Sequence, residues 1–326
     1  MTAMVTQSMK ETQREKKNVA RSVTVRVPGA TSNLGPGFDT LGLAMNVYNT
    51  VTFDVLEHDD KSVPLITLSE RTNQKLPSDA TNQIYQLLAN ELGAHAQLLS
   101  RVRMHIDCTV PIGAGLGSSG AAALSALWAA DALRDLAYDE KQLLRRAVAV
   151  EGHPDNVSPS LLGGFTVSAV SKSRDVLVKK LAWPDDWRPI FVVPVRELST
   201  KHARSVLPRL VPRMDAVHNV QRVALLLAAV AAKDETLLFE ALDDKLHEPY
   251  RASLVPELAE LRKLSRHSEV YGCVLSGAGP TIMLLTHSRS LNNVSGILED
   301  WAAAQQQQPQ ILKLEVDNQG LKQIDE

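Results

Sequence analysis

A glycine-rich turn that opens an apolar helix is the feature that most constrains this chain of 326 residues. In the segment PIGAGLGSSGA (111–121), Gly113, Gly115 and Gly117 alternate with small or apolar residues. The Ala/Leu-rich run that follows predicts a helix over Ser118–Leu133. Such a turn directs several backbone N–H groups to one place, with the positive end of the helix dipole behind them. The segment therefore predicts a binding site for a phosphate group.

Two well-known phosphate-binding loops do not fit this turn. A Walker A loop needs a lysine after its last glycine, whereas Gly117 is followed by two serines. The turn matches the GxGxxG spacing of a dinucleotide-binding fold, but Pro111–Ala114 separates the glycines from the expected strand, and a second helix follows the first. The alternative is that the glycines bind no ligand and serve only to let the helix pack tightly. The serine pair argues against it, because hydroxyls can hold a phosphate or its magnesium ion.

The composition excludes several classes of protein. Hydrophobic residues make up 44% and charged residues 22% of the chain, as in globular proteins, and 35 basic residues nearly balance 37 acidic ones. Neither nucleic acid nor a membrane is therefore an expected partner. Cys108 and Cys273 lie in apolar runs and predict buried free thiols in a reducing compartment. With no apolar run of membrane-spanning length and no apolar signal core at the N-terminus, we expect a cytoplasmic protein.

Strand and helix patterns interleave irregularly, which predicts an α+β protein of two domains. The expected division is a disordered tail at 1–20, an N-terminal domain at 21–182 and a C-terminal domain at 188–326, joined by Trp183–Arg188. The predicted strands are Ser22–Val27, Asn46–Leu56, Val102–Val110, Phe165–Val170, Ile190–Val195, Tyr271–Leu275, Ile282–Leu285 and Ile311–Val316. The predicted helices are Asn82–Leu92, Ser118–Leu133, Asp139–Val150, Asn156–Leu162, Lys201–Val206, Met214–Ala232, Glu235–Leu242, Val255–Leu264 and Asn292–Ala304.

Two further segments join turn formers to polar groups that a core excludes. The loop SNLGPGFD (32–39) carries Asn33 and Asp39 directly after a strand, and EGHPDN (151–156) offers two carboxylates, an imidazole and an amide. Glu151 ends a predicted helix, where its charge opposes the dipole, and this favours a cation beside it. Magnesium prefers carboxylate and phosphate oxygens. Taken singly, Asn33 and Asp39 could equally cap a turn, and His153 could be a structural histidine.

Two more segments carry arginines and a second glycine turn. Thr200 and Arg204 are four residues apart and share a helix face, and Arg251 follows a proline in a polar stretch. A guanidinium fork suits a carboxylate or a phosphate, although each arginine alone could be a solvated surface charge. The segment SGAGPT (276–281) lies between two apolar strands. It predicts a tight turn that contacts a ligand or the first glycine turn, or a plain hairpin.

Together, these segments resemble the GHMP small-molecule kinases. The first motif, NLGPGFDTLGL (33–43), resembles the homoserine kinase branch of that family rather than its galactokinase or mevalonate kinase branches. The resemblance runs from Val23 to Val316. It implies a two-domain fold, with an N-terminal domain like ribosomal protein S5 domain 2 and a ferredoxin-like C-terminal domain. It also implies a homodimer that uses ATP and Mg²⁺ to phosphorylate the side-chain hydroxyl of L-homoserine to O-phospho-L-homoserine, in threonine biosynthesis.

The resemblance also implies roles for single residues. The ATP phosphates would be wrapped by Pro111, Ile112, Gly113, Ala114, Gly115, Leu116, Gly117, Ser118, Ser119, Gly120 and Ala121, with Asn82 near the adenine. Magnesium would be held by Ser118 or Ser119 and by Glu151. The homoserine pocket would be lined by Asn33, Asp39, His153 and Asn156, with Arg204 and Arg251 on the carboxylate and Thr200 beside them. Asp39 would face the amino group, since a carboxylate accepts charge-assisted hydrogen bonds from an ammonium group.

Asn156 is expected to orient the reacting hydroxyl, and Asp155 is the second candidate, as a general base. The chain departs from the usual family motifs at Gly29 and Gly120, which keep the motif lengths but alter the turns. A relative that acts on an isoprenoid alcohol or a sugar is one alternative, against which the arginine pair and Asp39 argue. A non-catalytic nucleotide-binding regulator is the other.

Overall fold

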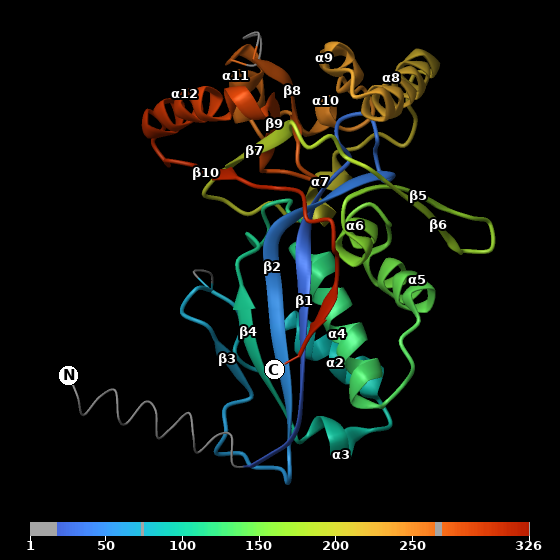
Figure 1. Cartoon of the computed structure of the whole chain (residues 1–326), viewed down its shortest axis with the longest axis vertical. Helices are drawn as coiled ribbons and strands as arrows, with labels where there is room; N and C mark the ends of the chain where they lie inside the picture. The colour runs from blue at the N-terminus through green and yellow to red at the C-terminus, as the bar shows by residue number, and fades with distance from the viewer. Residues whose placement is uncertain (1–17, 73–74, 265–268, 326) are drawn as a thin grey trace.

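Two β-sheets stand one above the other in an elongated molecule (Figure 1). The structure, a computed structural model, describes residues 18–72, 75–264 and 269–325. Its longest elements are the strands β1 (Val19–Ser32) and β2 (Leu41–Leu56), which pair antiparallel. In β2, the buried Val51, Phe53 and Val55 alternate with half-buried polar residues, so one face of the ribbon makes the core.

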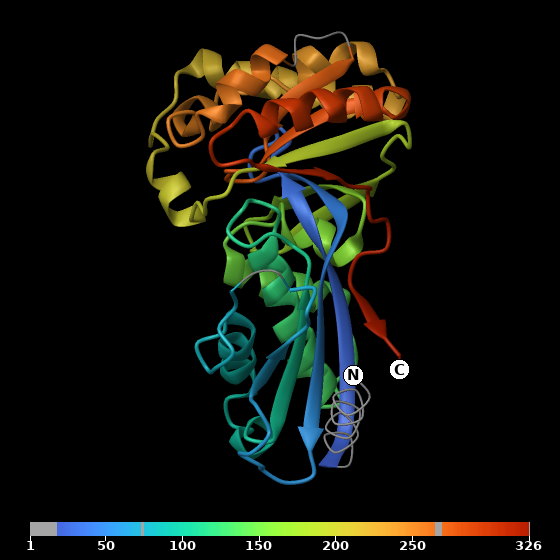
Figure 2. The ribbon, with the colours of Figure 1, turned by 90° about the vertical axis from the view of Figure 1, so that its left-hand side faces the viewer.

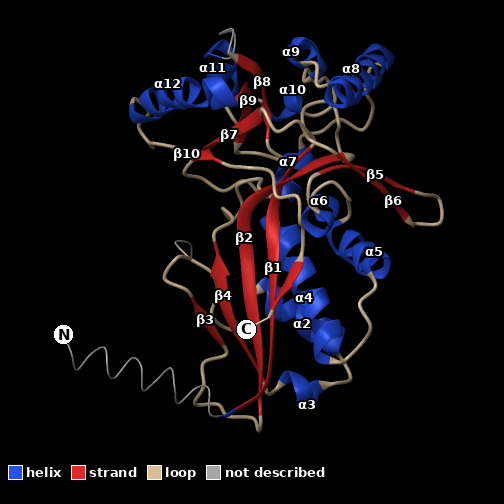
Figure 3. Ribbon diagram, in the orientation of Figure 1, coloured by secondary structure: helices blue, strands red, loops and turns tan. Residues whose placement is uncertain are grey.

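The first sheet has the strand order β11-β1-β2-β4-β3, with β5 paired to the start of β2 and β6 paired to β5. Its remaining strands are β3 (Ile66–Leu68), β4 (Val102–Cys108), β5 (Phe165–Val170), β6 (Val176–Leu181) and β11 (Lys322–Ile324). All of these pairs are antiparallel except β3 with β4. Because β5 pairs with β2 only over Leu41–Leu43, the β5–β6 hairpin projects from the side of the molecule (Figure 3).

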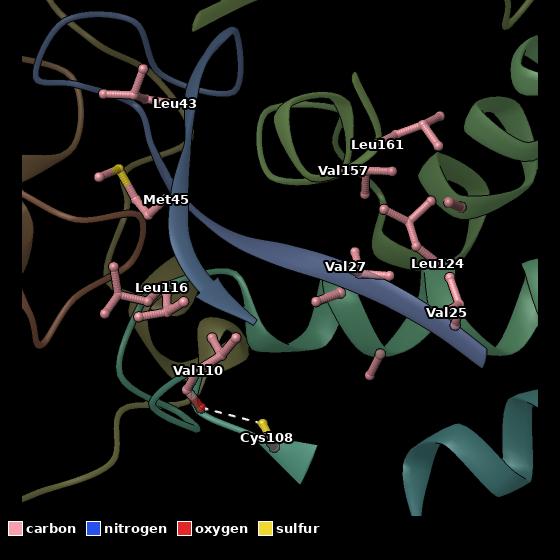
Figure 4. Close-up of a cluster of buried hydrophobic side chains, with 14 of the residues drawn as sticks. Val25, Val27, Leu43, Met45, Cys108, Val110, Leu116, Leu124, Val157 and Leu161 are labelled. Atoms are coloured by element: carbon pink, nitrogen blue, oxygen red, sulfur yellow. Dashed lines mark hydrogen bonds between the residues drawn. The ribbon is translucent and has the colours of Figure 1, made fainter. Parts of the chain in front are cut away.

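Helices cover one face of the first sheet (Figure 2). They are α2 (Gln83–Leu92), α3 (Ala96–Leu99), α4 (Ser118–Leu133), α5 (Glu140–Glu151) and α6 (Val157–Leu162). The central one, α4, is buried over nearly its whole length, as its Ala/Leu-rich sequence requires. In Figure 4, Val25 and Val27 of β1 face Leu124 of α4. The glycine turn is therefore anchored to the helix at the centre of the core.

The second sheet is antiparallel throughout, in the order β10-β7-β9-β8. These strands are β7 (Trp187–Val193), β8 (Val270–Leu275), β9 (Ile282–His287) and β10 (Gln310–Lys313). Met283 and Leu285 face the core shared with the first sheet, whereas Ile282 and Leu284 face a second apolar cluster. This alternation lets one sheet bury both of its faces.

Six helices surround the second sheet in the described part of the chain. They are α7 (Thr200–Ser205), α8 (Arg213–Ala232), α9 (Leu238–Ala241), α10 (Glu248–Arg251), α11 (Glu257–Leu264) and α12 (Leu291–Ala303), with 3-10 turns at Glu235–Leu237 and Ser288–Ser290. The second cluster is closed by Leu258 and Leu261 of α11 and by Val294 and Leu298 of α12. Among the described residues, no helix combines the length and the apolarity needed to cross a bilayer.

After β10 the chain returns to the first sheet through residues 314–324, here called the C-terminal strap (Figure 2). Val316 bridges to Met45, and β11 pairs with β1. The buried carboxylate of Asp317 accepts hydrogen bonds from the Tyr48 hydroxyl (2.8 Å) and from the backbone N–H groups of Gln319 and Gly320. Burial and this bond to Asp317 raise the pKa of Tyr48 to about 12, so its hydroxyl stays protonated and donates. The strap thus ties the two sheets together.

The sequence predicted most elements and missed the small ones. The helix Ser118–Leu133 and the strand Phe165–Val170 have the predicted bounds, and both cysteines are free and buried as expected. Strands β3, β6 and β11 and helices α3 and α10 were not predicted. The predicted strand Ile311–Val316 extends too far at its C-terminal end. Strand β10 stops at Lys313, where the chain turns toward the first sheet.

The sequence also predicted two irregular segments, a linker between the domains and an N-terminal tail. Trp187, expected in the linker Trp183–Arg188, begins β7 and packs edge-to-face on Trp183 with ring centroids 5.6 Å apart. The strand therefore starts inside the segment expected to be a linker, where two buried tryptophans pack together. Of the tail expected at 1–20, residues 1–17 lie outside the described part of the chain, and Val19 already belongs to β1.

Candidate functional site

The glycine turn leaves backbone donors free at the start of α4. Gly113, Gly115 and Gly117 have φ angles of +61°, +86° and +71°, which only glycine adopts without strain. Gly117 is the N-cap of α4 and offers no side chain to bond the first turn. The N–H groups of residues 118–120 therefore have no acceptor within the helix. They and the helix dipole make a site for an anion.

The three sequence motifs meet around this turn. Ser276 Oγ donates to the Gly115 carbonyl (2.7 Å), and the Ala30 N–H donates to the Leu116 carbonyl (3.0 Å). A Cβ on Gly115 would lie 2.3 Å from the Ser276 carbonyl oxygen. The SGAGPT turn thus contacts the first glycine turn, one of the two contacts that the sequence predicted for it.

A cavity of about 220 Å³ opens beside the turn. The expected site residues that line it are Asn33, Asp39, Ile112, Gly113, Gly115, Gly117, Ser118, Ser119, Gly120, Glu151, His153, Asp155, Asn156, Thr200, Arg204 and Arg251. Asn82, Pro111, Ala114, Leu116 and Ala121 are not among its lining residues. Asn82 instead caps α2, since its Oδ1 accepts from the Ile84 N–H and its Nδ2 donates to the Pro77 carbonyl.

One side of the cavity gathers hard oxygen atoms. Ser119 Oγ donates to Glu151 Oε1 (2.7 Å) and accepts from Gln83 Nε2 (2.9 Å). The end of α5 thereby faces the start of α4, and its carboxylate lies beside the free N–H groups. Hydroxyl and carboxylate oxygens next to a phosphate site are the donor set that magnesium prefers, so these residues fit that ion.

A second group of potential metal ligands fits an ion less well. Asp39, His153 and Asp155 bring ligand atoms within 4.8 Å of one another. However, Arg204 forks onto Asp39, and the His153 imidazole bonds Asp155 at 2.5 Å. A guanidinium already supplies the positive charge there, so a metal ion would meet repulsion.

The opposite side of the cavity pairs charges from distant parts of the chain. Arg204 of α7 donates from Nη1 and Nη2 to the two carboxylate oxygens of Asp39, at 3.1 and 2.5 Å. Asn33 fixes the loop, because its Oδ1 accepts from the Asp39 N–H and its Nδ2 donates to the Gly277 carbonyl. The sequence expected Asp39 and Arg204 to face opposite ends of a ligand, and did not predict this pair.

Arg251 is a buried cation with neutral partners. Its side chain is 1% exposed and donates to the carbonyls of Ala203 and Gly277 and to His247 Nδ1. It forms no ion pair with a carboxylate in the described part of the chain. Burial and the positive charge of Arg204 lower the pKa of Arg251 to about 10. A guanidinium that stays charged at this place in the cavity wall is a binding group for an anion.

The EGHPDN segment places three more groups on the cavity. Burial opposes protonation of His153, but the hydrogen bond and charge of Asp155 outweigh it and raise the pKa of His153. Asn156 Oδ1 is buried with no hydrogen-bond partner in the described protein. A buried carbonyl oxygen of this kind usually accepts a hydrogen bond, which a ligand or a water molecule would donate here.

Sequence reasoning missed Leu198 and Ser199, which line the cavity, and four further residues with closer contacts. Gln83 donates to Ser119, and Ser32 presents a buried hydroxyl. The Phe38 ring centroid lies 5.5 Å from the guanidinium carbons of Arg204 and Arg251. His247 contacts Arg251. Ser32 and Phe38 adjoin Asn33 and Asp39, which could have drawn attention to them. Gln83 likewise adjoins Asn82, and His247 lies four residues before Arg251, but the sequence does not show that the fold brings them against Ser119 and Gly35.

The fold and the site together define a GHMP kinase, a class of ATP-using phosphotransferases. Residues 80–164 match the family model for the GHMP kinases N terminal domain, and residues 226–304 match that for the GHMP kinases C terminal. A homoserine kinase of Desulfitobacterium hafniense is 37% identical over 91% of this chain and 98% of its own length. One of Aquifex aeolicus is 38% identical over 92% of this chain and 99% of its own. The chain belongs to the homoserine kinase family.

Solved structures agree with this assignment. The homoserine kinase of Cytophaga hutchinsonii is 28% identical, with a TM-score of 0.79 over 93% of this chain and 97% of its own. Mevalonate diphosphate decarboxylase of Staphylococcus aureus is 17% identical, with a TM-score of 0.66 over 94% of this chain and 98% of its own. The second likeness concerns the fold alone. The expected two-domain α+β GHMP kinase fold is confirmed.

Proposed function

We propose that this protein transfers the γ-phosphoryl group of ATP to the side-chain hydroxyl of L-homoserine, with Mg²⁺, to give O-phospho-L-homoserine for threonine biosynthesis. The observation that carries the proposal is the buried Arg251 beside the Asp39–Arg204 pair, directly next to the glycine turn. A cation and a carboxylate at one end of a phosphate site suit a zwitterionic amino acid. The names of the relatives point to the same substrate.

The phosphate chain of ATP would lie on the glycine turn. The N–H groups of residues 118–120 would bind its oxygens, in place of the lysine that a Walker loop supplies. Ser118 or Ser119 and Glu151 would hold Mg²⁺, which when bound neutralises charge on the phosphates. Gln83 would orient Ser119 through the bond that it donates.

Homoserine would bind by its two charged ends. Asp39 would accept hydrogen bonds from the ammonium group, and Arg251 and Arg204 would donate to the carboxylate, with Thr200 beside them. Because Arg204 already forks onto Asp39, ammonium and carboxylate would be recognised at one charged cluster. The Asn156 Oδ1, which lacks a partner in the described protein, would accept from the substrate hydroxyl and aim its oxygen at the phosphate.

The chemistry then needs little beyond positioning. Phosphoryl transfer passes through a loose transition state, so alignment and charge neutralisation supply most of the acceleration. Asn156 would hold the hydroxyl in line. Asp155 is the second candidate, as a base, and its hydrogen bond to His153 would steady it in that role.

A substrate panel tests the proposal. The purified protein is incubated with ATP, Mg²⁺ and L-homoserine, L-threonine, mevalonate or galactose in turn, and ADP release is measured. Release with homoserine alone supports the proposal. Release only with mevalonate or galactose would assign another GHMP activity, and release with none would favour a nucleotide-binding regulator.

A homodimer in the cytoplasm is the remaining part of the proposal. Supporting observations are the apolar Leu210, Met214 and Val220, which are 87%, 66% and 67% exposed on and before α8, and the two free thiols. Sedimentation equilibrium measures the assembly, and a monomer at micromolar concentration would contradict a dimer.

A further inference from the structure

His247 joins the two parts of the amino-acid pocket. Its ring is 0% exposed, directly before α10. One ring nitrogen, Nδ1, lies 3.0 Å from Nη1 of Arg251, and the other, Nε2, lies 2.9 Å from the Gly35 carbonyl oxygen. The ring also stacks on Phe38, with centroids 5.1 Å apart. One imidazole therefore touches the buried arginine and the loop that carries Asp39.

The partners fix the protonation state of this ring. A guanidinium has only donors, so Nδ1 must accept from Arg251. A carbonyl oxygen has only lone pairs, so Nε2 must carry the proton and donate to Gly35. Burial and the charge of Arg251 lower the pKa of His247, against the opposing charge of Asp244, whose carboxylate lies 3.7 Å from Nε2. The ring is neutral, in the single tautomer that serves both contacts.

The surroundings hold the ring in place. The buried Asp244 carboxylate accepts from the N–H groups of His247 and Glu248, at 2.9 and 2.7 Å. Asn219 of α8 donates to Asp244 and to the Pro36 carbonyl. The loop carbonyls of Gly35 and Pro36 are thus bonded to the same network, and a Cβ on Gly35 would meet the Leu242 carbonyl at 2.3 Å.

We propose that His247 is a positioning residue for the substrate amino acid: it holds the Arg251 fork at a fixed distance from Asp39, and so matches the pocket to a ligand with an ammonium and a carboxylate on one carbon. The inference rests on the proposed function, because Arg251 and Asp39 are the groups it positions. Among the described residues, none of the contacts of His247 is with the glycine turn at 111–121. We therefore expect His247 to affect the binding of the amino acid and not the binding of ATP.

Two substitutions separate the two contacts of the ring. The amide of His247→Gln can reach the Gly35 carbonyl, near the place of Nε2, but removes the acceptor for Arg251. His247→Asn keeps an acceptor near the place of Nδ1 and loses the bond to Gly35. We expect His247→Gln to raise KM for homoserine by roughly 10-fold, with KM for ATP within about 2-fold, and His247→Asn to recover part of the loss. His105→Gln, which alters an exposed imidazole on β4, is the matched control.

The Arg251→Leu background tests whether His247 acts through the arginine. There, adding His247→Gln should raise KM for homoserine no further, since the group it positions is gone. A full additional 10-fold rise, or an equal rise of both KM values in the single variant, would overturn the proposal.

The tautomer gives a test that does not depend on enzymatic activity. In ¹⁵N NMR spectra of the wild-type protein at pH 7.5, assigned by the signal missing from His247→Gln or His247→Asn, the His247 ring should carry one proton, on Nε2. A proton on Nδ1, or on both nitrogens, would contradict the proposal. If homoserine produced no ADP with the wild type, the proposed function would fail, while the NMR result would still decide the state of His247.

Discussion

At the scale of single residues, Arg251 carries a charge where bulk water does not reach it. Its partners are two carbonyls and one imidazole nitrogen, so an anion from the ligand would be the first negative group in direct contact with it. Truncating one member of a buried, hydrogen-bonded charge pair is costly, because the other charge is left unpaired. A substitution of Arg251 should therefore weaken amino-acid binding without weakening nucleotide binding.

Arg251→Leu should raise KM for homoserine by about 30-fold or more and leave KM for ATP within about 2-fold. The reason is that the amino acid has the carboxylate that Arg251 would hold. Steady-state kinetics with each substrate varied in turn measures both values. Arg174→Leu, at an exposed position between β5 and β6, is the control. Similar increases in both constants would remove Arg251 from the amino-acid pocket.

Glu151→Gln should raise the Mg²⁺ concentration for half-maximal activity by about 10-fold, since one anionic ligand becomes neutral. The amide can still accept from Ser119, so the contact between α4 and α5 is kept. The measurement is a Mg²⁺ titration at fixed free ATP. Glu140→Gln, at the exposed start of α5, should leave the titration unchanged. An unaltered midpoint for Glu151→Gln would exclude it as a ligand.

The sequence could predict those site residues that adjoin a turn former. Asn33, Asp39 and the EGHPDN segment are short, polar and rich in chemistry, so the local pattern is enough to single them out. It could not predict that Arg204 forks onto Asp39, 165 positions away, because no local pattern encodes that pairing. The same holds for His247, whose neighbours in sequence say nothing of Gly35.

At the scale of elements, the two glycine turns interlock. Gly115 has a left-handed backbone, and a Cβ at this position would meet the carbonyl oxygens of both Ser276 and Gly279, at 2.3 and 2.8 Å. A side chain there would clash with backbone atoms, which cannot rotate away. The conformation of the glycine turn at 111–121 is therefore determined by its contact with the turn between β8 and β9 as well as by its own sequence.

Gly115→Ala should lower the free energy of unfolding by about 2 kcal/mol or more, through the strained φ and the backbone clash. It should also raise KM for ATP, since the turn must move. Urea titration followed by circular dichroism gives the first value. Gly296→Ala in α12 adds a Cβ that meets nothing within 4 Å and should stabilise by about 0.5–1 kcal/mol. Equal stabilities of Gly115→Ala and wild type would contradict this account.

Elements were predictable where burial shows as a period in the sequence. The core strands have it, whereas α4 is buried nearly all round and was predictable from its continuous Ala/Leu-rich run. Strand β6 shows no such period, because its apolar Leu177 is 59% exposed and its other apolar residues are only half-buried. The strands β3 and β11 are three residues long, too short for any period to show. Their pairing depends on neighbours that only the whole fold supplies.

At the scale of the whole molecule, the C-terminal strap couples the two sheets. Asp317→Ala removes the acceptor of the Tyr48 hydroxyl and of two backbone N–H groups, and should lower the free energy of unfolding by about 2–3 kcal/mol. Asp325→Ala, at an exposed position beyond β11, should change it by less than about 0.5 kcal/mol. Calorimetric unfolding measures both. If the two variants unfolded alike, the strap would carry little of the coupling.

The pairing of Thr24 with Ile324 has a consequence for synthesis. A ribosome releases β1 early, and it has translated the entire second sheet before residues 322–324 emerge. Until then, the outer edge of β1 has no β11 to cover it, and its N–H and C=O groups remain open to other strands. The first sheet is thus begun by β1 and completed only after every strand of the second sheet has been synthesised.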